Sequence, residues 1–158
     1  MRMPNMQHDY VLWVMVVAYA LHIVEEPNLD WKGWIKRHAN FDVPLADSYV
    51  VNAALVVGMI TTAMIGWRLP KLSLAAAALM LINGLFFHIG ASFLKRRYSP
   101  GVLTSLILFL PIGAWAYYGA YLDGVLTTPV ALWSSVLGAL IMAFPLALYR
   151  LKIALGQA

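Results

Sequence analysis

The sequence has no cysteine among its 158 residues and few charged side chains. Without cysteine there is no disulfide, thiolate ligand or thiol nucleophile. Charged residues account for 11% of the chain, against about 25% in an ordinary soluble domain, while hydrophobic residues reach 62%. This composition predicts a protein that lies in the lipid bilayer.

Four long stretches contain no Asp, Glu, Lys or Arg: residues 48–67, 72–94, 98–122 and 124–149. Each has about the 20 residues that a helix needs to cross a hydrocarbon core. A fifth stretch is shorter and spans only if residues 7–26 form one helix, about 30 Å long. The sequence therefore predicts one all-α integral-membrane domain, residues 1–158, a polytopic helix bundle with transmembrane helices at about 7–26, 48–67, 72–94, 101–122 and 127–149.

The net charge of +4 reports on orientation, because Lys and Arg gather on the cytoplasmic side of membrane proteins. With the N-terminus outside, eight basic residues fall inside (Lys32, Lys36, Arg37, Lys95, Arg96, Arg97, Arg150 and Lys152) and three outside (Arg2, Arg68 and Lys71). We expect a plasma (inner) membrane protein with its N-terminus out and its C-terminus cytoplasmic. No basic run is interleaved with exposed aromatics, so no nucleic-acid partner is expected.

In this orientation, polar residues from separate segments reach a similar depth in the inner leaflet. His22, Glu25 and Glu26 end the first span, Asn52 lies about 7 Å past the inner end of the second, and His88 lies about 10 Å inside the inner boundary of the third. Burying an ionisable group within the membrane costs free energy, so such groups usually indicate a functional site. The sequence therefore predicts one polar site near the cytoplasmic side.

The loop after the first span predicts a short interfacial helix. Trp31, Trp34, Ile35 and His38 follow i, i+3, i+4, i+7 spacing, which gives one apolar face. The alternative is a plain loop with interfacial tryptophans. If the helix forms, it follows directly after the His/Glu cluster and can roof it.

The stretch HIVEEP, residues 22–27, places a histidine and two glutamates at the end of the first span, where Pro27 is expected to stop the helix. His22 lies one turn from both Glu25 and Glu26, so either pair can touch. The two glutamates differ by about 100° around the helix, so one faces the same centre as His22. Helix phase leaves open which glutamate that is.

Three elements in order, HIVEE, FFHIG and YSPG, resemble the HXXEE-domain membrane proteins, and the resemblance covers residues 10–101. It implies a membrane-embedded, enzyme-like site without naming a reaction. Carried over by position, it points to His22, Glu25, Glu26, His88, Tyr98, Pro100 and Gly101.

His22, His88 and one of the two glutamates make a His2Glu set, which suits a catalytic zinc site with an open fourth position. The other glutamate would then be a general base. Iron is the other divalent metal considered, but a dinuclear centre would have to recruit Asp30, Asp42, Asp47 or His38. In a metal-free version, a glutamate activates water while His88 and Asn52 stabilise an oxyanion.

Five further residues are candidates for substrate binding, and each has a simpler explanation. Asn52 and Asn83 also suit interhelical hydrogen bonds, Tyr98 an interface position, and Pro100 with Gly101 a helix-start turn.

The leading prediction is a small membrane enzyme with metal-assisted, hydrolase-type chemistry on an amphiphilic or small hydrophobic substrate. One alternative is electron transfer through a b-type haem with His22 and His88 as axial ligands. Another is a proton-coupled transporter or binding protein, for which a homodimer would supply the missing half.

Overall fold

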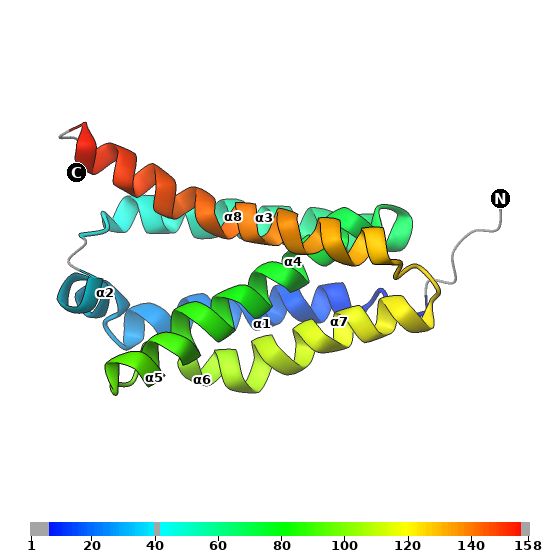
Figure 1. Ribbon diagram of the computed structural model, residues 1–158, viewed down its shortest axis with the longest axis horizontal. Coiled ribbons are helices and arrows are strands. Elements are labelled where there is room, and N and C mark those ends of the chain that lie inside the picture. The colour runs from blue at the N-terminus through cyan, green and yellow to red at the C-terminus, as the bar shows by residue number, and fades with distance from the viewer. Residues whose placement is uncertain (1–6, 40–41, 156–158) are drawn as a thin grey trace.

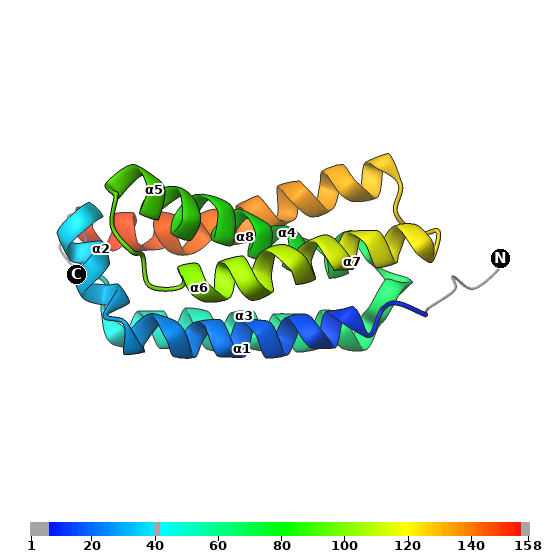
Figure 2. The same cartoon turned by 90° about the horizontal axis from the view of Figure 1, so that it is seen from below.

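The computed structural model describes residues 7–39 and 42–155, and in these ranges the chain forms a bundle of long helices without strands (Figures 1 and 2). The helices are α1 (Val11–Asn28), α2 (Trp31–Ala39), α3 (Leu45–Ile65) with η1 (Gly66–Arg68), α4 (Pro70–Ile82), η2 (Asn83–Gly90), α5 (Ala91–Lys95), α6 (Val102–Thr104), η3 (Ser105–Phe109), α7 (Leu110–Leu122) and α8 (Thr128–Ala154). The segments α4–η2–α5 and α6–η3–α7 each form one continuous rod (Figure 1).

Four of these rods are long and apolar enough to cross a membrane: Leu45–Arg68, Pro70–Lys95, Val102–Leu122 and Thr128–Lys152. The prediction of an all-helical membrane bundle is confirmed. Four of the five predicted spans correspond to helices that are long and apolar enough to cross a membrane. α1 is not among them, since its last turn carries Glu25 and Glu26, yet it runs beside α3 along the bundle (Figure 2). Large apolar side chains on the outside, such as Phe93, suit contact with lipid.

The prediction that Pro27 stops the first helix is wrong, because α1 continues through Pro27 to Asn28. Proline lacks an N–H group, but one lost hydrogen bond in a last turn is tolerated. The Leu29 N–H group closes the helix on the carbonyls of Glu25 and Glu26. Asp30 then adopts a left-handed backbone, φ 57°, which turns the chain into α2.

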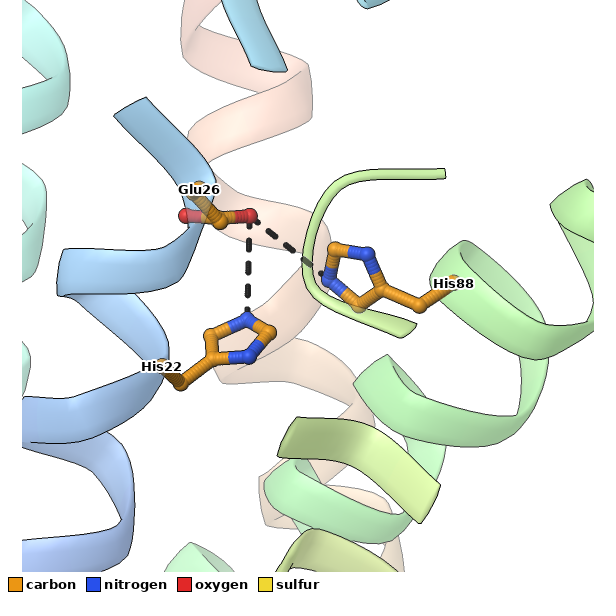
Figure 3. Close-up of side chains that lie close together, drawn as sticks. All are labelled: His22, Glu26 and His88. Carbon is orange, nitrogen blue, oxygen red and sulfur yellow. Dashed lines mark ion pairs between the residues drawn. The ribbon is translucent and has the colours of Figure 1, made fainter. Parts of the chain in front are cut away.

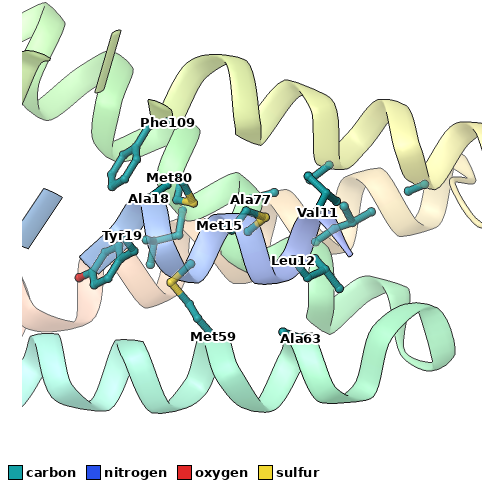
Figure 4. Packing of buried hydrophobic residues seen from close by; sticks show 14 of the residues in the cluster. Val11, Leu12, Met15, Ala18, Tyr19, Met59, Ala63, Ala77, Met80 and Phe109 are labelled. Carbon is teal, nitrogen blue, oxygen red and sulfur yellow. The ribbon is translucent and has the colours of Figure 1, made fainter. Parts of the chain in front are cut away.

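The segment α4–η2–α5 is the centre of the bundle. Within its most apolar 18-residue stretch 56% is buried, whereas the corresponding share in the other three spans is 17–28%. Small residues allow this: Gly138 of α8 lies so close to α4 that an added Cβ would sit 2.6 Å from the Cβ of Ala78. Around it, apolar side chains of α1, α3, α4 and η3 fill the half of the bundle away from α2 (Figure 4).

At the end of the bundle away from α2, a buried carboxylate links three segments of the chain through hydrogen bonds. Asp123, which follows α7, accepts hydrogen bonds from the backbone N–H and the ring Nδ1 of His8 at 2.8 and 2.6 Å and from Trp67 Nε1 at 2.9 Å. Its side chain is 1% exposed. Burial alone raises the pKa of Asp123, but the bonds from His8 and Trp67 outweigh it and hold this pKa below its ordinary value of 3.8.

Asp123→Asn is expected to lower the free energy of unfolding by about 1–3 kcal/mol at pH 7, because an amide cannot accept all three bonds. Because the pKa of Asp123 is lower in the folded protein than the unfolded value of 3.8, its ionised carboxylate stabilises the fold at pH values above 3.8. This stabilisation is lost as the pH falls below 3.8 and the folded carboxylate takes up a proton. Tryptophan-monitored thermal unfolding in detergent at pH 7 and 3 should therefore show a smaller acid-induced loss in the variant. Asp42→Asn, which breaks an exposed ion pair at the other end, is the control, and an equal effect there would contradict the prediction.

Candidate metal centre

The last turns of α1 carry the first two residues of the site. His22 and Glu26 lie one turn apart on the same face, and the His22 Nε2 atom is 3.6 Å from Glu26 Oε1. His22 is 1% exposed and the Glu26 side chain is 13% exposed. Both point into the bundle, where a carboxylate without a counter-charge costs several kcal/mol.

The third residue, His88, comes from a stretch of π-helix. The wider turn of η2 departs from α-helical geometry over Asn83–Gly90, and such segments are frequent at functional sites. A second π segment, η3, packs against η2. Gly84 permits this approach, since a Cβ there would lie 3.3 Å from the Cβ of Ser105. The two π segments thus bring His88 to the end of α1.

His22, Glu26 and His88 form a compact triad of donor atoms (Figure 3). The Nε2 atoms of both histidines lie 3.6 Å from the same oxygen, Glu26 Oε1, and the two rings meet edge to face with centroids 4.7 Å apart. The 3.6 Å between each Nε2 atom and Glu26 Oε1 is too long for a hydrogen bond. It matches the ~3.4 Å between two ligands of a tetrahedral zinc ion that each bind at about 2.1 Å.

The protonation of His22 follows from its neighbour Thr104. The Thr104 hydroxyl donates to Glu25 Oε2 at 2.5 Å, so it must accept from His22 Nδ1, which lies 2.7 Å away. The Nδ1 atom therefore carries the proton, and Nε2 presents its lone pair to the centre of the triad. No described residue makes a hydrogen bond with Nε2. Metal-binding histidines are commonly oriented in this way through the other ring nitrogen.

His88 is held by the turn that precedes α6. The backbone carbonyl of Pro100 approaches its imidazole, although Nδ1 makes no hydrogen bond of ordinary geometry with the described residues. Gly101, with φ +95°, lies against both histidine rings. A Cβ at this position would lie 2.6 Å from His88 Nδ1 and 2.7 Å from His22 Cε1, so only glycine fits.

Glu25 points away from the triad and caps α6 instead. Its carboxylate accepts hydrogen bonds from the backbone N–H groups of Gly101, Leu103 and Thr104, at 2.8–3.2 Å. The hydroxyls of Tyr98 and Thr104 add two more. Burial and the bond to Glu25 raise the pKa of Tyr98, so its hydroxyl stays protonated and donates at neutral pH. With these five bonds, the Glu25 carboxylate is committed to the start of α6.

A cavity of about 370 Å³ opens beside the triad. His22, Glu26 and His88 line it, together with Asn52 and Asn83. The cavity walls come from α1, α3, η2 and α8, and α2 forms the roof over one end.

The residues of the apolar face predicted for the loop helix, Trp31, Trp34, Ile35 and His38, all line this roof. α2 forms as the spacing predicts, and it covers the site as expected.

The remaining acidic residues that a dinuclear centre would need are engaged elsewhere. Asp30 binds Arg37 at 3.0 Å, Asp42 binds Lys36 at 2.8 Å, and Asp47 binds Lys152 at 2.6 Å. The ring of His38 contacts the Trp34 carbonyl. The geometry thus offers a single-ion site.

Two residues of the site were not anticipated. Tyr19 donates to Asn52 Oδ1 at 2.8 Å and lines the cavity, and Thr104 orients His22. Tyr19 lies three residues before His22, on the same helix face, which is a signal the sequence contains. Thr104 has no such signal, because its contacts join segments more than 75 residues apart.

The fold and site define a small polytopic helical protein with a buried His–Glu–His cluster at one end. Within that class, the chain belongs to the family described as "Protein of unknown function with HXXEE motif", which matches residues 13–116 and includes the whole triad. It is also 24% identical over 143 residues to "Uncharacterized protein YrkK" of Bacillus subtilis (strain 168), covering 85% of this chain and 90% of that relative. No solved structure matches.

Gly101→Ala is expected to displace both histidine rings and to weaken metal binding at least ~10-fold, as for loss of other orienting contacts. Gly124→Ala is a matched control, because Gly124 also has a positive φ, +71°, but no non-neighbouring atom of the described residues lies within 4 Å of an added Cβ. Metal titration of both purified variants checks this. If metal binding weakens equally in Gly101→Ala and Gly124→Ala, backbone strain explains the effect, and the contact of Gly101 with the histidine rings does not.

Proposed function

We propose that the protein is a membrane-embedded, metal-dependent enzyme with hydrolase-type chemistry, whose ion is held by His22, Glu26 and His88. The observation that carries the proposal is the convergence of two imidazole Nε2 atoms on one carboxylate oxygen, at 3.6 Å each. An unpaired carboxylate and an unpaired Nε2 lone pair would be costly in this buried setting, and a cation between them satisfies both.

Zinc suits the donor set best, because two histidines and one carboxylate leave a fourth position open. Iron also accepts these donors. Such an ion would supply Lewis acidity within an otherwise apolar cavity. With Glu26 bound to the ion, the negative charge of Glu25 on the neighbouring residue balances the remaining positive charge.

The chain's own residues prepare the cavity for a polar reaction. Because Tyr19 donates to Asn52 Oδ1, the Asn52 amide NH2 is oriented as a donor at the cavity wall, where it can stabilise negative charge on a substrate oxygen. Trp31 and Trp34 cover one end and limit access of water. Glu25 acts as a positioning residue through Thr104 rather than as a general base.

The geometry disfavours the haem alternative. Axial ligands must lie on opposite faces of a macrocycle, whereas the two rings contact each other edge to face and the Glu26 carboxylate approaches both Nε2 atoms. A transport path receives no support either, since the apolar cluster of Val11, Leu12 and Met15 fills the other half of the bundle.

The metal proposal predicts one ion per chain in detergent-purified protein, lost in His22→Ala, His88→Ala and Glu26→Gln. Elemental analysis and an absorption spectrum measure this and identify the element. Glu26→Gln keeps the shape of the side chain, so loss of metal with an unchanged unfolding temperature would assign the effect to coordination.

Substitutions at Glu25 and Thr104 separate metal coordination from the positioning of the ligands. Glu25→Gln should lower thermal stability, because the charge-assisted cap is weakened, and it should weaken metal binding without abolishing it, because Glu25 orients the ligands and is not one of them. Thr104→Val should weaken metal binding about 10–100-fold, and Thr104→Ser should restore it. Native protein that binds neither added zinc nor added iron would refute the proposal.

The proposed site faces the cytoplasm. The basic residues Lys95, Arg96 and Arg97 lie at the end of the bundle that holds the triad, which supports this orientation. Since the chain has no cysteine, Arg97→Cys in cells should react with a membrane-impermeant maleimide only after the membrane is opened. Labelling in intact cells would place this end outside.

A further inference from the structure

A second cavity, of about 320 Å³, adjoins Glu26. It lies between the last turns of α1, the start of α2 and the first turns of α3. Four residues line both this second cavity and the triad cavity described above: Glu26, Trp31, Ser48 and Asn52. Glu26 is the one member of the triad that borders both, because His22 and His88 line only the triad cavity. The proposed metal ligand thus lies where two cavities meet.

The triad cavity opens toward the lipid. Phe86 of η2 and Leu146 of α8 line it while they are 68% and 39% exposed. Phe86 lies nine residues before Lys95, which ends α5, so this opening is about 13 Å from the end of that span. At the same end, α2 covers the triad cavity. An opening at that depth admits the apolar part of a substrate, but the hydrocarbon around it contains almost no water.

The second cavity opens instead at the ends of the helices. Lys32, in the first turn of α2, lines it, and the Lys32 side chain is 48% exposed. Leu45, the first residue of α3, lines it as well. An exposed ammonium group at the ends of the spans marks the aqueous boundary of the membrane. The opening of the second cavity therefore lies at the level of the water and the lipid headgroups.

Polar groups continue from this opening inward to the triad. Lys32 lies at the mouth, Ser48 follows one turn after the start of α3, and Asn52 and Glu26 line the inner part that the two cavities share. Hydroxyl, amide and carboxylate groups are costly to cover with hydrocarbon, whereas water can form hydrogen bonds with all of them. The chemistry of these walls favours water over an acyl chain as the content of the second cavity.

We propose that the second cavity is the water entrance of the metal site, through which water and the ion reach Glu26 from the aqueous surface beside Lys32. Hydrolysis consumes water at the ion, and the roof formed by α2 leaves the triad cavity open mainly to lipid. An apolar substrate and its water thus arrive at the triad through separate openings. This role rests on the proposed function, whereas the hydration of the second cavity can be measured without it.

Two adjacent alanines of α3 provide the test. Ala53 lines the second cavity and Ala54 lines neither cavity, although both are exposed and lie within about 1.5 Å of the same depth. Because the chain has no cysteine, Ala53→Cys and Ala54→Cys each carry a single thiol. A thiol reacts as its thiolate, and a pKa raised by one unit in an apolar setting lowers the thiolate fraction about 10-fold.

The reagent is a cationic, membrane-impermeant methanethiosulfonate, added to both sides of phosphatidylcholine vesicles that contain each variant. We expect Ala53→Cys to react at least ~10-fold faster than Ala54→Cys, as measured by mass spectrometry of the intact protein. If both thiols are equally unreactive, lipid fills the second cavity, and if both react equally fast, water surrounds this whole turn of α3. Either result would overturn the proposal.

A second pair on α1 keeps the test valid if Ala53→Cys does not fold. Ile23 lines the second cavity from the opposite wall, whereas Leu21 is 51% exposed and lines neither cavity. Ile23→Cys should therefore react faster than Leu21→Cys with the same reagent, and the reverse order would contradict a hydrated cavity between α1 and α3.

Zinc uptake connects the second cavity to the metal site. Once the thiosulfonate has modified Ala53→Cys, metal-free protein should take up added zinc more slowly than modified Ala54→Cys, with the same final amount bound. Equal uptake rates would overturn the role of the second cavity as the entrance. Failure of the metal proposal gives a different result, which is protein that binds no zinc while the thiol at position 53 still reacts faster than the one at position 54.

Discussion

The site depends on the hydrogen bonds between Glu25, at the end of α1, and the backbone at the start of α6. The first N–H groups of a helix have no partner within it and carry partial positive charge, so a carboxylate from another helix is a strong cap. This cap fixes the turn around Gly101, which lies against the rings of both His22 and His88. It also positions Thr104, which in turn selects the tautomer of His22. One structural contact thus orients both imidazoles.

Two adjacent glutamates can serve opposite purposes because neighbouring positions on a helix point about 100° apart. Glu25 turns toward α6 and has both its oxygens satisfied by the chain. Glu26 turns toward the cavity, where, among the described residues, the polar atoms closest to its Oε1 are two histidine nitrogens at 3.6 Å. The first arrangement is complete without a ligand, and the second becomes favourable when a cation occupies its centre. The doubled glutamate of the motif therefore combines a helix cap with the proposed metal ligand in one turn.

The two ends of the bundle are built differently. At one end, Asp123 joins His8 to Trp67, and apolar side chains fill the space between α1, α3 and α4. At the other, α8 and α5 diverge, two π segments widen the central rods, and a cavity remains under α2 (Figure 1). Stability from the packed end allows polar groups to persist at the open one, where their burial would otherwise be costly.

Much of this protein could be predicted from its sequence, because hydrocarbon thickness and the scarcity of charge act locally along the chain. The four long apolar spans, the short helix α2 and the membership of the motif family followed from run lengths, periodicity and three ordered motifs. The depth of His88 near the end of α1 followed from counting residues along helices of known rise.

Only the tertiary structure decided which glutamate faces the cavity, that α1 runs through Pro27, and that Thr104 orients His22. These features depend on helix rotation and on contacts between distant segments, which change with a single-residue shift in phase. A periodic pattern fixes the faces of one helix, but the partner that each face meets is set by the packing of the whole bundle.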